Sequence, residues 1–344
     1  MKVVRFHEQG GLEVLKYDDA PDPQVGPGQV LVRVRAAAAN HVDLWVREVY
    51  PVSLPHIPGS DGAGEVVEVG PGVTTLRVGD RVAIYPGVTC NKCDFCLAGE
   101  SSACVDFGVF GVRTDGTFAE LTVVEEENAF PIAPTVTFEE AAAFPVVYLT
   151  AWHSLINRAG LRAGETVLIH AASSGTGTAA IQLAKFAGAR VIAATGEGRK
   201  FELAKDIGAD NVISNRTPDW PDHVMALTQG KGVDVVVDHL GPVTFANSLS
   251  CLNRLGRLVT FGATTGADVG FDLRQLYSRQ LSIIGSMAGN RDEFSRLLRL
   301  LEKGLIKPVI DRVLPLSEAK EADRMLAEGS QFGKIVLLPA ADRS

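Results

Sequence analysis

The sequence predicts an α/β protein built from a β-rich domain and a doubly wound parallel-sheet domain. Its 344 residues exceed what one hydrophobic core usually supports, so two domains are expected. Residues 1–130 alternate Val-rich segments with Gly and Pro at turns, which is typical of antiparallel β structure. From Thr137 onward, apolar strands alternate with helical segments, which indicates a parallel sheet covered by helices on both faces.

The strands expected in the first region are short and end at turn residues. They lie at 29–40, 62–70, 80–86 and 118–126. A helical period then covers FEEAAAFPVVYLTAWHSLINRAG at 138–160. The expected parallel strands follow at 165–172, 189–195, 211–214, 233–241, 256–262 and 281–286, with helices at 178–188 and 199–208. The tail adds an amphipathic helix at 292–306 and a final strand at 332–339.

Composition limits the kinds of function that the chain can have. A hydrophobic fraction of 46% and a charged fraction of 22% are those of a globular protein. The formal net charge of -8 and the lack of a Lys- and Arg-rich segment argue against nucleic-acid binding, so a small-molecule substrate is expected. The sequence has neither a basic, apolar leader nor an uncharged apolar run of about 18 residues, so we expect a cytoplasmic protein that binds no membrane.

A turn of small residues indicates a dinucleotide site at the start of the parallel region. The first strand runs into HAASSGTGTAAIQLAK at 170–185, so a helix begins directly after the turn. Backbone N–H groups at such a helix start can face a pyrophosphate, and only small side chains let the phosphates come close. A plain strand-to-helix turn has the same pattern, but the series of strands and helices favours dinucleotide binding. Ala172 and Gly177 stand at the first and last glycine positions of G-x-G-x-x-G, and the expected contacts are Ser174, Gly175, Thr176 and Gly177.

The end of the second parallel strand decides between NAD and NADP. A carboxylate there would bind the ribose hydroxyls of NAD and repel the 2′-phosphate of NADP. The chain has Thr195 and Gly196 at this point, followed by Arg199 and Lys200. The missing acid and the two cations favour NADPH, because a phosphate dianion gains charge-assisted hydrogen bonds from them. The alternative is that both cations are the solvated first turn of a helix, partly cancelled by Glu197, which would leave NAD.

Four of the five cysteines lie within residues 90–104. Cys90, Cys93, Cys96 and Cys104 have the spacing C-x2-C-x2-C-x7-C, which can wrap a loop around one tetrahedral zinc ion. Four thiolates leave no position for water or substrate, so the predicted site is structural. The alternatives are an iron–sulfur cluster, two disulfides or a chance clustering of cysteines, and a reducing compartment argues against the disulfides. Cys251 stands alone and is expected to be a small buried apolar residue.

The order of these features resembles one known family. The β-rich region, the four-cysteine lobe at 86–108, the run AGEVVEVGPGVTTLRVGDRV, the turn SSGTGTAA and the terminal FGKIV resemble the medium-chain dehydrogenase/reductase superfamily over essentially the whole chain. That superfamily includes zinc alcohol dehydrogenases and quinone oxidoreductases. The resemblance implies a GroES-like catalytic domain at 1–147 and 287–344, and a Rossmann NAD(P)-binding domain at 148–286.

The resemblance also implies where a second, catalytic zinc would be held, and the chain departs from the pattern there. The family's first cysteine ligand falls at Asn40, its His-Glu pair at Ser60 and Asp61, and its last cysteine at Val146. An amide, a hydroxyl and an alkyl group thus replace three expected ligands.

The proton relay of the alcohol-oxidising members is missing as well. Its hydroxyl falls at Val42 and its histidine at Trp45, and neither side chain can pass a proton. Asp43 does match the family's acid beside the site. The local scaffold is therefore expected to be kept while the metal chemistry is not.

Without a Lewis acid, the easier reaction is hydride addition to an electron-poor acceptor, because the charge that develops is delocalised into an enolate. We therefore predict an NADPH-dependent oxidoreductase that acts on a quinone, an enone or an enoyl thioester and holds one structural zinc. Asn40 and Tyr50 are expected to polarise the substrate oxygen, although Tyr50 also fits a partly buried loop aromatic. Asp43 lies beside the site, and Thr150 matches a family position near the nicotinamide.

Further cofactor contacts are expected at the ends of strands and at positions that match the family. Ligands of open α/β sheets bind outside the carboxyl ends of the strands. These contacts are His41, Gly262, Met287 and Lys334. The last strand of the Rossmann domain is apolar and lies at a sheet edge, so a homodimer, or a homotetramer built from dimers, is expected.

The sequence also allows two other functional interpretations. His41, Asp43, His56 and Asp61 could form an irregular metal site, which would indicate a zinc-dependent alcohol dehydrogenase or aldehyde reductase with non-standard ligands. The protein could also bind NADPH without catalysing a reaction.

Overall fold

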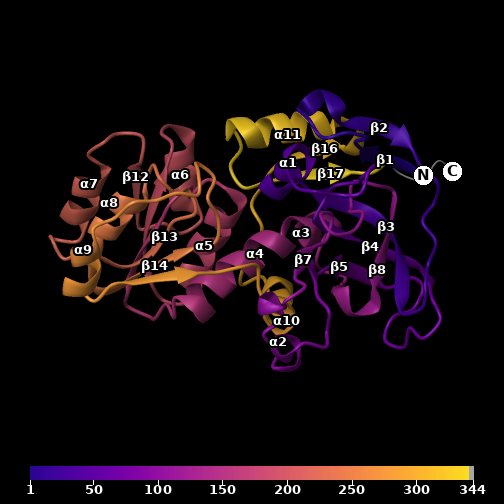
Figure 1. Ribbon diagram of the computed structural model, residues 1–344, viewed down its shortest axis with the longest axis horizontal. Helices are drawn as coiled ribbons and strands as arrows, with labels where there is room; N and C mark the ends of the chain where they lie inside the picture. The colour runs from indigo at the N-terminus through magenta and orange to yellow at the C-terminus, as the bar shows by residue number, and fades with distance from the viewer. Residues whose placement is uncertain (341–344) are drawn as a thin grey trace. The chain divides into compact units, whose positions relative to one another are not determined.

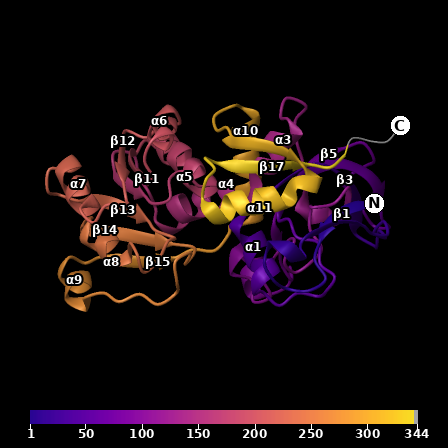
Figure 2. The same ribbon diagram turned by 90° about the horizontal axis from the view of Figure 1, so that it is seen from above.

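The computed structural model describes residues 1–340, and the chain divides into two compact units. Unit 1 comprises Met1–Val147 and the segment from Asn290 onward, and unit 2 comprises Tyr148–Gly289 (Figures 1 and 2). The second crossing between the units therefore lies at Asn290 rather than at the expected residue 287. Each unit has a sheet of its own.

Unit 1 is built around a seven-stranded sheet. The path of the sheet runs β16-β17-β3-β4-β5-β9, and β8 also pairs with β3. The strands are β3 (Gln29–Ala38), β4 (Asp61–Val69), β5 (Arg81–Ile84), β8 (Leu121–Glu125), β9 (Ala129–Pro131), β16 (Ile310–Pro315) and β17 (Lys334–Leu338). β16 has no counterpart among the strands expected from the sequence, and its parallel pairing with β17 also departs from the antiparallel expectation. The helix α11 (Ala319–Glu328) supplies the crossover that a parallel pair requires.

Distant parts of the chain meet in this sheet. β17 pairs with β3, with Val336 opposite Ala38, and both views show β17 among strands from the start of the chain (Figures 1 and 2). β3 pairs with β4 as well, with Ala38 opposite Asp61. The register therefore brings the residues around Ala38, from three strands, to one end of the sheet.

Unit 1 also contains helices and small two-stranded sheets outside this large sheet. The helices are α1 (His41–Glu48), α2 (Asp94–Leu97), α3 (Phe138–Ala143) and α10 (Arg291–Glu302), and the hairpins pair β1 (Lys2–Arg5) with β2 (Lys16–Asp19) and β6 (Gly87–Val88) with β7 (Gly108–Val109). α1 begins in a capping box, in which the Asp43 side chain accepts from the backbone of Asn40. Apolar clusters around Phe6 and Phe118 and around Val82 contribute to the core of the described part of the unit.

Unit 2 is a doubly wound α/β domain, as the sequence predicts. Its six parallel strands lie in the order β12-β11-β10-β13-β14-β15, which is 3-2-1-4-5-6 when they are counted along the unit. The strands are β10 (Thr166–Ile169), β11 (Arg190–Thr195), β12 (Asn211–Ser214), β13 (Val233–Val237), β14 (Leu252–Thr260) and β15 (Ser282–Gly285). The helices are α5 (Gly175–Phe186), α6 (Arg199–Asp206), α7 (Trp220–Leu227), α8 (Phe245–Ser250) and α9 (Leu273–Ser278).

The helical segment expected at 138–160 is broken rather than continuous. α3 ends before Pro145, which begins α4 (Pro145–Trp152), and a π-helical turn follows at His153–Arg158. Proline fits the first turn of a helix because no intrahelical partner is needed for its missing N–H. Within residues 1–340, no helix combines the length and the apolar character needed to cross a lipid bilayer.

Candidate functional site

Three positions that match the family's catalytic-zinc ligands come together in unit 1. Asn40 follows β3, Ser60 precedes β4, and Val146 lies in the first turn of α4. The Nδ2 atom of Asn40 donates to Oγ of Ser60 at 3.0 Å and to Oδ2 of Asp61 at 2.8 Å. The backbone N–H of Val146 donates to the other oxygen of Asp61 at 2.8 Å. The three positions are therefore gathered around the buried carboxylate of Asp61.

A lysine from the C-terminal strand completes this cluster. The Nζ atom of Lys334, at the start of β17, donates to Ala39 O at 2.8 Å, to Asn40 Oδ1 at 2.6 Å and to Asp61 Oδ2 at 2.8 Å. These contacts use all three N–H groups of the ammonium. Lys334 was expected to contact the cofactor; that contact stays a prediction, and the structure shows all three of its donors engaged inside unit 1. The sequence signal was a single lysine in the apolar run FGKIVLLP.

Lys334 fixes the orientation of the Asn40 amide. Because an ammonium has only donors, Oδ1 of Asn40 must face it, and Nδ2 is then directed to Asp61 and Ser60. Both N–H groups of the amide are thereby used. Ser60 accepts one of them, and its own O–H has no acceptor in the described part of the chain. The free donor of the cluster is therefore the Ser60 hydroxyl, which sequence reasoning missed.

Asp43 supports the loops on which these groups lie. Its Oδ2 accepts from the backbone N–H of Asn40 at 2.8 Å, and its Oδ1 accepts from that of Gly59 at 3.2 Å. Burial is the largest influence on this carboxyl and raises its pKa to about 7, although the hydrogen bond from Asn40 acts in the opposite direction. Asp43 therefore ties the start of α1 to the segment before β4.

The irregular metal site considered from the sequence is not assembled. Asp43 and Asp61 are engaged by the donors described above, and Nε2 of His56 lies 2.9 Å from the backbone oxygen of Gly111. Among residues 1–340, the only group of three or more His, Cys, Asp or Glu side chains that could hold a metal ion is the four-cysteine cluster.

The four-cysteine cluster fits a zinc ion. The sulfurs of Cys90, Cys93, Cys96 and Cys104 all lie within 4.8 Å of one another, with Cys93 and Cys96 3.6 Å apart and Cys90 and Cys104 3.5 Å apart. Tetrahedral Zn–S bonds of about 2.3 Å place sulfurs about 3.8 Å apart, so the donors have the right spacing. Backbone hydrogen bonds lower the pKa of the Cys93 thiol, whereas burial and the neighbouring thiols raise the pKa of Cys96, so the spacing of the sulfurs is the evidence for zinc. A closed set of four sulfurs suits a structural ion.

The cysteine lobe is anchored to the start of α10. Oδ1 of Asn290 accepts from the backbone N–H of Ser102 at 2.8 Å, and its Nδ2 donates to Glu100 at 3.1 Å. Arg291 donates to Asn91 at 2.7 Å and pairs with Glu127 at 2.9 Å. The lobe therefore stabilises the join between the two chain segments that make up unit 1.

In unit 2, the turn between β10 and α5 has the geometry of a phosphate cradle. A Cβ on Gly177 would lie 2.3 Å from the backbone oxygen of Ala171, so the close approach of helix and strand requires glycine. Ser174 caps the helix, with its Oγ accepting from the backbone N–H of Gly177 at 3.0 Å. The backbone N–H groups of Gly175 and Thr176 have no acceptor within the described residues. The turn therefore fits the pyrophosphate of a dinucleotide.

The remaining predicted residues occupy varied surroundings. Thr195 is buried at the end of β11 and its hydroxyl has no hydrogen-bond partner in the structure, whereas Arg199 is exposed at the start of α6. Lys200 follows Arg199 and is half-buried. Tyr50 and Met287 are exposed, and Thr150 and His41 are half-buried. Gly262 follows β14. A Cβ built on Gly262 would lie 3.4 Å from Cβ of His239, which is an ordinary van der Waals contact.

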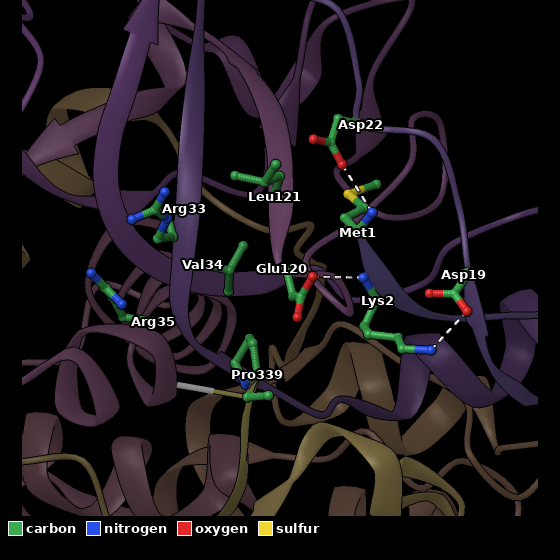
Figure 3. A pocket seen from close by; sticks show the side chains of 11 residues that line it. Met1, Lys2, Asp19, Asp22, Arg33, Val34, Arg35, Glu120, Leu121 and Pro339 are labelled. Atoms are coloured by element: carbon green, nitrogen blue, oxygen red, sulfur yellow. Dashed lines mark hydrogen bonds and ion pairs between the residues drawn. The ribbon is translucent and has the colours of Figure 1, made fainter. Parts of the chain in front are cut away.

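A cavity of about 420 Å³ lies elsewhere on unit 1 (Figure 3). Lys2, Asp19, Asp22 and Glu120 are among its lining residues, and none of the predicted site residues lines it. Its charged groups are already engaged: Lys2 pairs with Asp19 at 2.8 Å, and the amino terminus pairs with Asp22 at 2.9 Å. We therefore assign no role to this cavity.

Comparison with known proteins assigns the chain to a family. Residues 26–134 match the alcohol dehydrogenase GroES-like domain, and residues 175–303 match the zinc-binding dehydrogenase family. A quinone oxidoreductase from Pseudomonas aeruginosa is 35% identical over 350 residues, which covers 98% of this chain and 99% of the relative. The chain belongs to the medium-chain dehydrogenase/reductase superfamily.

Other members of the superfamily are similar along their whole length. An alcohol dehydrogenase from Schizosaccharomyces pombe is 31% identical over 337 residues, with 96% of each chain covered. The crystal structure of an NAD-dependent alcohol dehydrogenase has a TM-score of 0.95 and 44% identity, covering 98% of this chain and 99% of that one. The three relatives are thus named for two activities, quinone reduction and alcohol oxidation.

Proposed function

We propose that this medium-chain dehydrogenase/reductase transfers hydride from NADPH to a conjugated, electron-poor carbonyl compound without a catalytic zinc. A quinone, an enone and an enoyl thioester are the acceptor classes. The observation that carries the proposal is that the three ligand positions hold Asn40, Ser60 and Val146, gathered around a carboxylate already paired with Lys334.

The donor set supports a metal-free reaction centre. Zinc in proteins is bound by sulfur, imidazole nitrogen and carboxylate oxygen, and Asp61 is the only such ligand at these positions. Both of its oxygens accept hydrogen bonds within unit 1, and Oδ2 faces the Lys334 ammonium. A divalent cation at Asp61 would meet that positive charge at short range, where repulsion in a buried site is strong.

The charge that develops on the acceptor's oxygen requires a hydrogen-bond donor. We assign this role to the Ser60 hydroxyl, because it accepts from Asn40 and keeps its own proton for donation. Asn40 then acts by orienting Ser60. Ser60 is fully buried, so such a bond would form away from bulk water, where it is worth more. Tyr50 stays a second candidate donor.

The residues of unit 2 are proposed to bind and orient the cofactor. When bound, NADPH supplies the hydride. The backbone N–H groups from Ser174 to Gly177 are proposed to hold its pyrophosphate, and Thr150, Gly262 and Met287 are proposed to lie near its nicotinamide half. In unit 1, burial lowers the pKa of His41, so its imidazole would contact a phosphate as a neutral hydrogen-bond donor.

Metal analysis and a substrate panel test this proposal together. We expect about one zinc per chain, held by the four cysteines in a reducing compartment. NADPH oxidation is then followed with a quinone, an enone, an enoyl thioester and a simple aldehyde. Turnover of the conjugated acceptors supports the proposal. Two zinc ions per chain with turnover of only the aldehyde would indicate an alcohol dehydrogenase, and no turnover at all would indicate an NADPH-binding protein.

A homo-oligomer joined through β15 is part of the proposal. β15 is an edge strand of the unit 2 sheet, and its Ile283 side chain is 37% exposed. Exposed apolar edge strands are aggregation hazards unless another strand covers them. Light scattering is expected to show a dimer or tetramer, and Ile283→Lys is expected to shift the population toward the monomer.

A further inference from the structure

The guanidinium of Arg216 lies against Gly196, directly after β11. A Cβ built on Gly196 would be 3.3 Å from Nη2, 3.4 Å from Nε and 3.5 Å from Cζ of Arg216. The missing side chain at Gly196 therefore lets the guanidinium approach the backbone at this strand end. In a chain that binds NAD, this strand end carries a carboxylate for the ribose hydroxyls. Here the same place is occupied by a cation.

The sheet register explains how Arg216 reaches this position. β11 and β12 are neighbouring parallel strands, and Thr195 at the end of β11 is opposite Ser214 at the end of β12. Arg216 follows Ser214 by two residues, so it leaves the sheet beside Gly196. Open α/β sheets bind their ligands outside the carboxyl ends of the strands, which is the edge on which both residues lie. The sequence around β11 alone does not reveal this neighbour.

The surroundings of Arg216 leave its guanidinium available to bind an anionic ligand. The side chain is exposed, and its guanidinium has no hydrogen bond or ion pair within residues 1–340. Arg199 adds a second exposed cation at the start of α6, and Glu197 is the only acid between Thr195 and Lys200. Thr195 contributes an independent indication of a ligand, because it is 2% exposed and its hydroxyl has no hydrogen-bond partner among residues 1–340. A polar group buried without a partner is costly unless a ligand satisfies it.

We propose that Arg216 selects NADPH over NADH by binding the 2′-phosphate of the adenosine ribose beside Gly196. A guanidinium offers a planar fork of donors that matches a phosphate dianion with two parallel hydrogen bonds. Arg199 is the supporting cation. The inference rests on the proposed function only for the choice of cofactor. It adds Arg216, which follows the neighbouring strand β12, to the cations expected directly after β11.

Adenosine fragments test the proposal without requiring turnover. Binding of 2′,5′-ADP and of 5′-AMP is measured by calorimetry for the wild-type chain, Arg216→Gln and the matched control Arg199→Gln. The wild-type chain is expected to bind 2′,5′-ADP at least about tenfold more tightly than 5′-AMP. Arg216→Gln is expected to remove most of that ratio while leaving 5′-AMP binding unchanged, and Arg199→Gln is expected to reduce it less. Because the Arg216 side chain is exposed and makes no hydrogen bond or ion pair within residues 1–340, the variant is expected to fold, which the unfolding temperature checks.

Two outcomes would overturn the proposal. Equal binding of both fragments to the wild-type chain would show that no 2′-phosphate site exists, and an unchanged ratio in Arg216→Gln would assign the site to other cations. A failure of the proposed hydride transfer looks different, because the acceptor panel would then be inactive while the fragment ratio and its loss in Arg216→Gln persist. Gly196→Asp offers a further check, since a carboxylate beside Arg216 is expected to reverse the preference toward 5′-AMP.

Discussion

The Nζ atom of Lys334 lies 2.8 Å from Oδ2 of Asp61, and the two side chains are 3% and 0% exposed. The pair joins β17, near the C-terminus, to the first residue of β4. An intact buried pair contributes little more than well-packed apolar residues would, because both charges lose their hydration. Loss of one partner is different, since the other is left as a buried charge without compensation.

Lys334→Met is expected to lower the free energy of unfolding by about 3–5 kcal/mol, because it leaves Asp61 charged and buried. Adding Asp61→Asn to that variant is expected to restore part of the loss, since the double variant carries no unpaired charge. Denaturant unfolding measures both effects. The control is Lys2→Met, which removes a partly exposed pair with Asp19 and is expected to cost less than about 1 kcal/mol. Equal losses in the two single variants would contradict the assignment of a buried pair.

Ser60→Ala tests the proposed oxygen-binding donor. Removal of one such donor is expected to lower kcat by about 10²–10³ with the best conjugated acceptor, while the affinity for NADPH stays unchanged. Steady-state kinetics and NADPH titration measure the two quantities. Ser60→Thr keeps the hydroxyl and is expected to retain more activity than Ser60→Ala. Unchanged kcat in Ser60→Ala would transfer the role to another donor, with Tyr50 as the next variant to examine.

The fold was predictable because its signals are local. Continuous apolar strands alternating with helices in unit 2 predict a parallel sheet, and the order 3-2-1-4-5-6 confirms it. The break at Pro145 follows from proline chemistry but was hidden inside a helical period. β16 escaped prediction because its residues are mostly exposed or half-buried, so it lacks a clear apolar alternation.

The candidate site was predictable only in part, because its contacts join distant segments. The positions Asn40, Ser60 and Val146 came from the family pattern, and the structure brings them together around Asp61. The orientation of the Asn40 amide depends on Lys334, which is 294 residues away in sequence. Arg216 reaches Gly196 only through the register of β11 with β12. Neither the Lys334–Asn40 contact nor the Arg216–Gly196 contact corresponds to a residue spacing that can be recognised in a single sequence.

Asp43 is expected to make stability depend on pH below neutrality. Burial raises its pKa from 3.8 to about 7, so between these values the folded chain keeps a proton that the unfolded chain loses. The free energy of unfolding is therefore expected to fall as the pH rises from about 4 to about 7, with a slope of at most about 1.4 kcal/mol per pH unit, and to level off above that range. Denaturant unfolding across this range measures the slope.

Asp43→Asn is the matched variant for this prediction, because its side chain does not titrate. Burial also raises the pKa of the Asp323 carboxyl to about 6. Asp323 therefore contributes to the pH dependence of the free energy of unfolding, in the same direction, in both the wild-type chain and Asp43→Asn. The difference between the wild-type chain and Asp43→Asn is therefore the relevant quantity. Parallel curves for the two chains would show that Asp43 is ionised in the folded protein throughout the range.

Cys96→Ser separates the role of the structural metal from that of the reaction centre. Loss of one of four thiolates is expected to lower the zinc content from about one per chain to well below one and to reduce the unfolding temperature, because a zinc ion bound there would hold the lobe together. The matched control is Cys251→Ser, since Cys251 is buried in unit 2 and lies outside the one possible metal-ligand cluster among residues 1–340, so the zinc content of this variant is expected to be unchanged. Metal analysis, thermal unfolding and NADPH oxidation are measured on the same preparations. None of the four cysteines is part of the proposed reaction centre around Asp61. Turnover per folded Cys96→Ser chain is therefore expected to persist after zinc is lost. Loss of turnover while the chain is still folded would place the metal in the reaction and contradict this division of roles.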